Sequence, residues 1–212
     1  MSKSKPDHQV SGKLNQQTSQ ERFDHQLIIN LITSETRVLD LGCGDGTLLS
    51  KLIERKKCKV TGIEIDEQAI YECVAKGVSV SHADINTGLS DFSNKRFDYV
   101  ILNESLQQIL HPQEIILEAL RVGKKVIVGI PNFCHSKARF QIFFSGMVPV
   151  TKELPYQWYN TPNLRFLSLK DFRLFCRQNQ IKILKEIGIA DGKTIKYWPN
   201  LFANVGIYLL EK

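Results

Sequence analysis

Apolar residues along this chain alternate between short continuous runs and wider, helix-like spacing, so strands and helices are predicted in turn. The run at residues 38–41 stops at Gly42, and apolar residues then recur at helical spacing over residues 48–53. The same pattern predicts three more strands, at residues 59–66, 77–85 and 97–103. This order predicts an α/β fold with a doubly wound, mostly parallel sheet and helices on both faces.

The second half of the chain continues the alternation and would complete a Rossmann-like sheet of seven strands. Helices are predicted at residues 111–122 and 168–180, and strands at residues 123–132, 181–190 and 204–212, the last of them antiparallel. An amphipathic helix is predicted at residues 21–32, before the sheet, whereas residues 1–20 are polar and are expected to be disordered. We therefore expect a single domain at residues 21–212.

The alternation breaks at about residues 131–168, where a short helix at 136–144 leads into a long irregular segment. Long irregular segments in compact domains are usually functional loops. This one combines prolines and polar groups with Tyr156, Trp158 and Tyr159. Aromatic residues with a polar end are enriched at protein interfaces and also close over small ligands. A surface loop packed by its own side chains is the alternative interpretation.

The composition fits one α/β domain and narrows the possible functions. The chain has 212 residues, 42% of them hydrophobic, which is enough for a full core. The net charge is +6, but most basic residues alternate with acids, so no nucleic-acid partner is expected. The five cysteines form no CxxC pair, and no apolar run reaches the roughly 18 residues that span a bilayer. We expect reduced thiols, a cytoplasmic location, and neither a membrane partner nor a metal.

The loop GCGDG at residues 42–46 joins the first strand to its helix and has the features of a nucleoside-binding turn. Its glycines allow positive φ and a close approach of a ligand, and the next helix offers free amides. The spacing is GxGxG rather than the GxGxxG of dinucleotide sites, and the Lys of a P-loop is missing. Asp40 and Asp45 flank the turn, so a cationic cofactor is favoured over a pyrophosphate. An ordinary glycine-rich turn is the alternative.

The string VLDLGCGDG, residues 38–46, resembles the glycine motif of the class I methyltransferases, whose cofactor S-adenosylmethionine is cationic. The next strand ends carry acids that agree with this resemblance. Glu64 is expected to bind the cofactor ribose, while Asp66 is expected to cap the following helix. Asp84 resembles the acid that accepts a hydrogen bond from the adenine amino group.

Apolar and amide side chains complete the predicted cofactor site. Ile63, Ile65 and Ile85 could flank the adenine plane. Asn103 leaves the fourth strand at the same edge of the sheet. The residues predicted to bind S-adenosylmethionine or S-adenosylhomocysteine are Asp40, Gly42, Cys43, Gly44, Gly46, Glu64, Ile65, Asp84, Ile85 and Asn103.

The sequence offers single catalytic candidates but no complete set. The candidates for a general base or acid are Glu104, His111, His135 and Tyr156. Each also has a structural interpretation: Glu104, for example, is equally suited to be a solvated acid at a strand end. No combination of acid, base and orienting group emerges. The fourth strand ends in NESL, which differs from the NPPY-type motif that resembles amino-methylating nucleic-acid enzymes.

Longer strings indicate a narrower family. PNFCHSKARFQ, MVPVTKELPYQWYNTPN, SLKDF and NLFANVGIYLL, with GIEID and FDYVILNESLQ, resemble the methionine biosynthesis protein MetW family from about residue 36 onward. Ser136 and Asn160 depart from it, where an aromatic residue and an acid are common. The resemblance implies work with a homoserine O-acyltransferase (MetX) in O-acylhomoserine formation, rather than an established methyl transfer. The alternatives are a free-standing small-molecule methyltransferase and a pure S-adenosylmethionine sensor.

Overall fold

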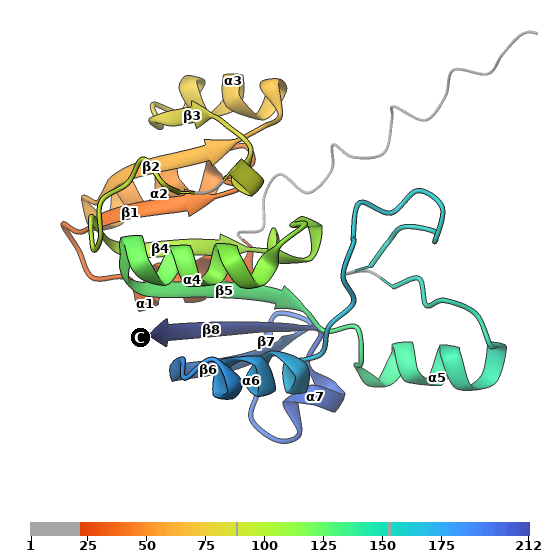
Figure 1. Ribbon diagram of the computed structural model, residues 1–212. Coiled ribbons are helices and arrows are strands. Elements are labelled where there is room, and N and C mark those ends of the chain that lie inside the picture. Colours follow the sequence, from red (N-terminus) through yellow and green to blue (C-terminus); the bar gives the residue numbers. More distant parts are fainter. Residues whose placement is uncertain (1–21, 88, 152–153) are drawn as a thin grey trace, which may run out of the picture.

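In the part of the chain that the computed structural model describes, residues 22–87, 89–151 and 154–212, eight strands form one sheet. Their order across the sheet is β3-β2-β1-β4-β5-β8-β6-β7 (Figure 1). The strands are β1 (Arg37–Leu41), β2 (Lys59–Glu64), β3 (Val80–His82), β4 (Phe97–Asn103), β5 (Gly123–Pro131), β6 (Lys182–Ala190), β7 (Lys193–Ile195) and β8 (Val205–Glu211). The tail at residues 1–20, predicted to be disordered, lies outside the described residues.

The pairing of the strands confirms the predicted doubly wound fold. Strands β3, β2, β1, β4 and β5 pair in parallel, and the chain changes direction across the sheet between β1 and β4. Strand β8 is antiparallel to both neighbours, β5 and β6. The sequence predicted seven strands because β7 has only three residues, too few to show a periodic pattern. It forms a hairpin with β6 at the edge of the sheet.

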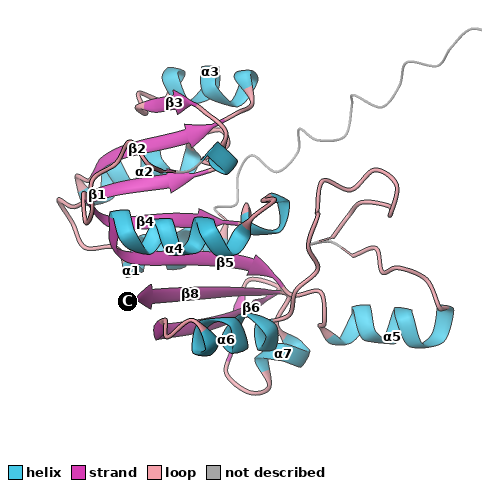
Figure 2. Cartoon of the chain, in the orientation of Figure 1, coloured by secondary structure: helices cyan, strands magenta, loops and turns pink. Residues whose placement is uncertain are grey.

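Helices cover both faces of this sheet, as the sequence predicted (Figure 2). Residues of α1, α2 and α3 pack on one face, and residues of α4 and α6 pack on the other. The helices are α1 (Phe23–Leu31), α2 (Thr47–Lys56), α3 (Glu67–Ala75), α4 (Pro112–Val122), α5 (Ser136–Ser145), α6 (Leu169–Gln178) and α7 (Pro199–Phe202), with the 3₁₀ turns η1 (Ile85–Thr87) and η2 (Leu106–Gln108). None of the described helices is long and apolar enough to cross a membrane.

The two-residue period of the strands divides the apolar residues between two cores. Val126 and Val128 of β5 face the core under α4, whereas Ile127 between them faces the core under α1 and α2. All three side chains are fully buried, as expected for a strand covered on both faces. This packing fixes the carboxyl ends of β1, β2, β3 and β4 at one edge of the sheet. α5 and the segment after it extend away from the sheet (Figure 1).

Candidate cofactor site

The glycine loop between β1 and α2 is held in a conformation that favours glycine. Gly42, Gly44 and Gly46 all have positive φ, at +78°, +53° and +72°. At Gly46 a Cβ atom would lie 2.8 Å from the sulfur of Cys73 on α3, closer than side chains approach one another. The absence of a side chain at Gly46 therefore lets α3 pack directly against the loop.

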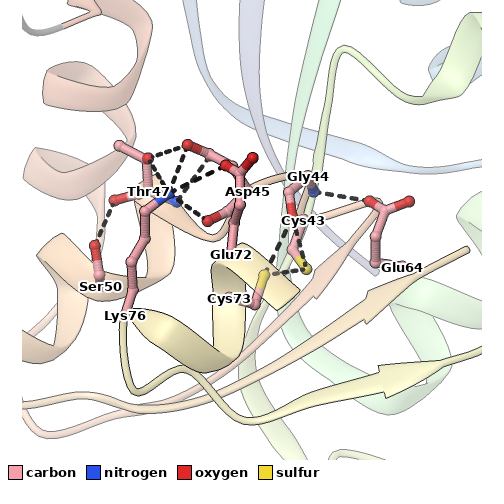
Figure 3. A network of polar contacts seen from close by, with 9 residues as sticks. All are labelled: Cys43, Gly44, Asp45, Thr47, Ser50, Glu64, Glu72, Cys73 and Lys76. Carbon is pink, nitrogen blue, oxygen red and sulfur yellow. Dashed lines mark hydrogen bonds and ion pairs between the residues drawn. The ribbon is translucent and has the colours of Figure 1, made fainter. Parts of the chain in front are cut away.

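Helix α3 braces the glycine loop through polar contacts as well (Figure 3). The Cys73 thiol donates to the carbonyl of Gly44 at 3.1 Å, and Lys76 Nζ lies 2.6 Å from Asp45 Oδ2. Thr47 also donates two hydrogen bonds to Asp45. Partial burial raises the pKa of Asp45, but the hydrogen bonds from Lys76 and Thr47 outweigh it and lower the pKa to about 2. The Asp45 carboxylate is thus paired with groups of the loop and of the end of α3.

A pocket of about 380 Å³ opens at the carboxyl ends of the strands. It lies where the sheet changes direction, which is the usual ligand position in doubly wound sheets. Three carboxylates face it, and the described residues contribute no Lys or Arg to its lining. The lining residues are Gly42, Glu64, Ile65, Ala83, Asp84, Ile85, Asn86, Asn103, Glu104, Ser105, Gln108 and Ile109.

Glu64 connects the end of β2 to the glycine loop. Its Oε2 accepts a hydrogen bond from the amide of Gly44 at 2.8 Å, and its Oε1 accepts from the amides of Ile65 and Asp66 at 2.8 Å and 3.0 Å. These bonds fix the carboxylate at the pocket wall. Because each carboxylate oxygen has two lone pairs, Oε2 can accept one more hydrogen bond. Asp66 accepts from the amide of Ala69 at 2.8 Å, so its predicted role as a helix cap is confirmed.

The end of β3 supplies a second carboxylate. Asp84 Oδ1 accepts from both the backbone and the side-chain nitrogen of Asn86, each at 2.8 Å. Asp84 is thereby oriented by its own turn, while both residues line the pocket. Ile65, which is 59% exposed, and Ile85 add apolar surface to the same wall. A flat apolar ring with hydrogen-bonding edges would fit such a wall.

The end of β4 is tied to the start of α1 by charged groups. Arg22 donates to Glu104 at 2.6 Å and to Asp24 at 2.7 Å. Asp24 also accepts from the side-chain nitrogen of Asn103 at 2.9 Å. Burial raises the pKa of Asp24, but the hydrogen bond and charge of the Arg22 guanidinium outweigh burial. The net effect is a lowered pKa, so this carboxyl stays ionised. The residue Glu104 has a positive φ of 59°, which costs backbone strain in a residue with a Cβ. Two members of this network, Asn103 and Glu104, line the pocket.

Two buried polar atoms at the pocket have no partner among the described residues. They are the hydroxyl oxygen of Ser105 and the side-chain oxygen of Asn103. Buried polar groups are nearly always hydrogen-bonded, so each such atom requires an explanation. A bound ligand with a polar group would satisfy the Ser105 hydroxyl, whereas the Asn103 oxygen lies over Gly129 of β5.

The structure brings six of the ten predicted cofactor residues to the pocket wall: Gly42, Glu64, Ile65, Asp84, Ile85 and Asn103. The other four lie outside the lining. Gly44 and Gly46 shape the loop, and Cys43 is buried with its sulfur 3.8 Å from that of Cys73. Asp40 is buried in the sheet, where desolvation and the charge of Glu64 raise its pKa to about 7.

The four catalytic candidates do not come together. Glu104 lines the pocket, whereas His111 precedes the first turn of α4 and His135 precedes that of α5. His135 is 2% exposed and is absent from the pocket lining. Tyr156 lies in the irregular segment, in a small hollow shared with Pro149 and other residues of that segment.

Sequence reasoning missed several residues at the pocket. Ala83, Asn86, Gln108 and Ile109 line it but were not predicted. Asn86 and Gln108 carried a usable signal, because each is a polar residue shortly after a predicted strand end. No sequence signal pointed to the contact between Arg22 and Glu104, because the two residues are far apart in the chain. Among the described residues, no group of three or more His, Cys, Asp and Glu could hold a metal ion.

Solved structures with the same arrangement define the class of fold. An S-adenosylmethionine-dependent methyltransferase of Thermotoga maritima matches with a TM-score of 0.66 and 18% identity over 90% of each chain. The [4+2]-cyclase SpnF matches with a TM-score of 0.65 and 18% identity, over 89% of this chain and 80% of its own. The fold is therefore that of the class I S-adenosylmethionine-dependent methyltransferases. Because a cyclase has a similar fold, the fold by itself does not identify the reaction.

Sequence comparison identifies the family within this class. The family model described as methionine biosynthesis protein MetW matches residues 22–210, and the chain belongs to this family. The bifunctional methionine biosynthesis protein MetXA/MetW of Rhodopirellula baltica is 32% identical over 202 residues, covering 89% of this chain. This chain spans 32% of that relative's length. A ubiquinone biosynthesis O-methyltransferase of Pseudomonas fluorescens is 24% identical over 83% of this chain and 78% of its own.

Proposed function

We propose that this chain binds S-adenosylmethionine in the strand-end pocket and supports a homoserine O-acyltransferase in the formation of O-acylhomoserine. The observation that supports the acyltransferase as partner is the Rhodopirellula baltica relative. Its name, bifunctional MetXA/MetW, places a MetXA part and a MetW part in one chain. Two parts joined in one chain act at a high effective concentration of each other. We take such an acyltransferase as the partner of the described residues.

The character of the pocket supports the cofactor. S-adenosylmethionine carries a sulfonium and an ammonium. Three carboxylates, with no Lys or Arg among the described lining residues, favour such a cation over a phosphate. Glu64 would accept from the ribose hydroxyls, and Asp84 from the adenine amino group. Ile65 and Ile85 would contact the adenine ring. When bound, the cofactor would carry an activated methyl group, but its role here would be recognition.

A companion role agrees with the scattered catalytic candidates. Methyl transfer to a hydroxyl needs a base within about 2.6–3.2 Å of the acceptor, held by an orienting group. At the pocket only Glu104 is available among the four candidates, and Arg22 already occupies its Oε2 at 2.6 Å. A carboxylate oxygen that already accepts from a guanidinium has fewer lone pairs free for an acceptor hydroxyl.

The test is co-purification with a homoserine O-acyltransferase, followed by an acylation assay with and without this chain. A required companion should bind the acyltransferase and raise its rate of O-acylhomoserine formation. An acyltransferase that neither binds the chain nor changes its rate would exclude the companion role. Calorimetry with S-adenosylmethionine tests the cofactor separately, and glutamine in place of Glu64 provides the control.

The second candidate function is a free-standing small-molecule methyltransferase. The observation that favours it is the similarity to ubiquinone biosynthesis O-methyltransferases, at 24% identity for the Pseudomonas fluorescens relative. Incubation with labelled S-adenosylmethionine and a metabolite extract separates the two functions. An enzyme yields labelled product over many turnovers, whereas a companion yields none.

Regulation by the cofactor is a further part of the proposal, since S-adenosylmethionine is a downstream product of methionine biosynthesis. Turn η2 lies between the pocket and the irregular segment: Gln108 lines the pocket, and the carbonyl of Gln107 accepts from the amides of Leu164 and Arg165 at 2.9 Å and 3.1 Å. A ligand that shifts η2 would therefore move the end of that segment. Thermodynamic linkage requires the partner to change the cofactor affinity by the same factor. Equal affinities with and without the partner would reject this coupling.

A further inference from the structure

Helix α5 carries an aromatic surface that nothing in the described chain covers. Phe140, Phe143 and Phe144 are 66%, 82% and 67% exposed. Their rings contact one another, with centroids 4.2 Å apart for Phe140 and Phe144 and 4.9 Å apart for Phe143 and Phe144. Ala138 is the only buried residue within the helix. Figure 1 shows α5 extending away from the sheet.

An exposed helix of this composition is unusual on a monomer. Large apolar residues occur singly on most protein surfaces, but clusters of them mark binding sites. A ten-residue helix is also marginally stable in water without packing partners. Phe140, Phe143 and Phe144 occupy positions i, i+3 and i+4, the spacing with which a helix inserts one side into an apolar groove.

The surface continues into the segment after the helix. Met147 and Val148 are exposed, and Val148 lines a small hollow together with Tyr156 and Trp158. Trp158 is 75% exposed. Helix α5 and the irregular segment with Tyr156 and Trp158, the aromatic loop, therefore form one projecting surface. We call this surface the arm, and it comprises residues 136–151 and 154–163. Isolated aromatic residues of this kind act as anchors in protein interfaces.

We propose that the arm is the docking element for the homoserine O-acyltransferase, and that the Phe140, Phe143 and Phe144 side of α5 inserts into an apolar groove of that enzyme. This inference rests on the proposed function, because it takes its partner from there. The family match over residues 22–210 includes the arm, and the Rhodopirellula baltica relative carries both parts in one chain. That relative thus joins a MetXA part to a MetW part in one molecule.

Two other molecules could cover α5, a second copy of this chain and a membrane, and the side chains of the arm argue against both. Residues 132–151 contain Lys137 and Arg139 but no acid, so two α5 helices packed on each other would bring like charges together. A groove with an acidic rim near the start of the helix suits these cations. The amide side chain of Gln157 is exposed between the aromatics of the loop, and its polar groups would lose their hydrogen bonds to water in hydrocarbon. A protein groove can satisfy them.

The experiment measures binding of the full chain to purified homoserine O-acyltransferase by calorimetry. The test variant is Phe143→Ser with Phe144→Ser, and the matched control is Tyr197→Ser, which removes a side chain that is 83% exposed outside the arm. Because all three side chains are exposed, both variants should keep the thermal unfolding midpoint of the wild type. We expect the test variant to lose at least about 30-fold in affinity and the control to match the wild type.

Other outcomes overturn the inference in distinguishable ways. If the wild type binds the acyltransferase and the test variant binds equally well, the arm is not the docking element, although the companion role stands. If the wild type itself does not bind, the proposed function fails and the inference with it. Sedimentation of a wild-type dimer that the test variant abolishes would assign α5 to a second copy of the chain. Flotation with phosphatidylcholine–phosphatidylglycerol vesicles, abolished in the test variant, would assign it to a membrane.

Discussion

Replacing Gly46 by alanine tests whether the contact between the glycine loop and α3 holds the pocket together. A Cβ at Gly46 would lie 2.8 Å from the sulfur of Cys73 and 3.3 Å from its Cα. Rotating the thiol away would relieve the first contact but would break its hydrogen bond to the carbonyl of Gly44. Gly44 is the matched control, because it also has positive φ but no atom lies within 4 Å of its would-be Cβ.

The two substitutions share one cost and differ in another. A residue with a Cβ in the left-handed region costs roughly 1–2 kcal/mol, and this applies to Gly44→Ala and Gly46→Ala alike. Overpacking adds about 1–3 kcal/mol, and it applies at Gly46 only. We therefore expect the free energy of unfolding to fall by about 1–2 kcal/mol for Gly44→Ala and by about 2–5 kcal/mol for Gly46→Ala.

Urea unfolding followed by circular dichroism, without cofactor, measures both changes. A double-mutant cycle with Cys73→Ala isolates the contact, since removing the sulfur makes room for the new methyl group. We expect Gly46→Ala to cost at least about 1 kcal/mol less in the Cys73→Ala background. Equal losses for the two glycine variants, or no relief from Cys73→Ala, would refute the packing argument.

Three further predictions concern charge, cofactor and partner. Burial and the charge of Glu64 raise the pKa of Asp40 to about 7, so the folded protein keeps a proton that the unfolded chain releases above about pH 4. The wild type should therefore lose stability relative to Asp40→Asn as pH rises from about 4 to 7, with no further change above; a flat difference curve in urea unfolding would contradict the raised pKa. Glu64→Gln should weaken S-adenosylmethionine binding in calorimetry by about tenfold or more, because a neutral amide replaces the anionic acceptor; unchanged affinity would remove Glu64 from the site. Tyr156→Ala with Trp158→Ala should weaken acyltransferase binding, and unchanged affinity would exclude the aromatic loop from the interface.

Much of the fold followed from the sequence because its signals are local. The apolar runs and the glycine loop predicted the strands up to β5, and the parallel arrangement then placed the ends of β1, β2, β3 and β4 at one edge. Glu64, Asp84 and Asn103 could therefore be assigned to one pocket before any contact was known. Asp66 was assigned to a helix cap by the same local logic, and its hydrogen bond to Ala69 confirms this.

The direction of each charged side chain was decided by contacts between distant parts of the chain. Asp45 lies within the glycine loop, yet it pairs with Lys76 at the end of α3. Glu104, a candidate base by sequence, pairs with Arg22 from α1. Neither partner is visible to a local pattern, because it becomes a neighbour only when helices pack on the sheet.

The sequence by itself thus determined most of the order of strands and helices, except β7 and α7, as well as the edge of the sheet at which a ligand would bind and the family. Only the tertiary structure decided that Asp40 and Asp45 lie outside the pocket lining, that Glu104 lies in it, and that the aromatic side chains of α5 are left uncovered. The physical reason is that hydrophobic periodicity fixes which face of an element is buried, whereas packing between elements fixes what each remaining side chain meets.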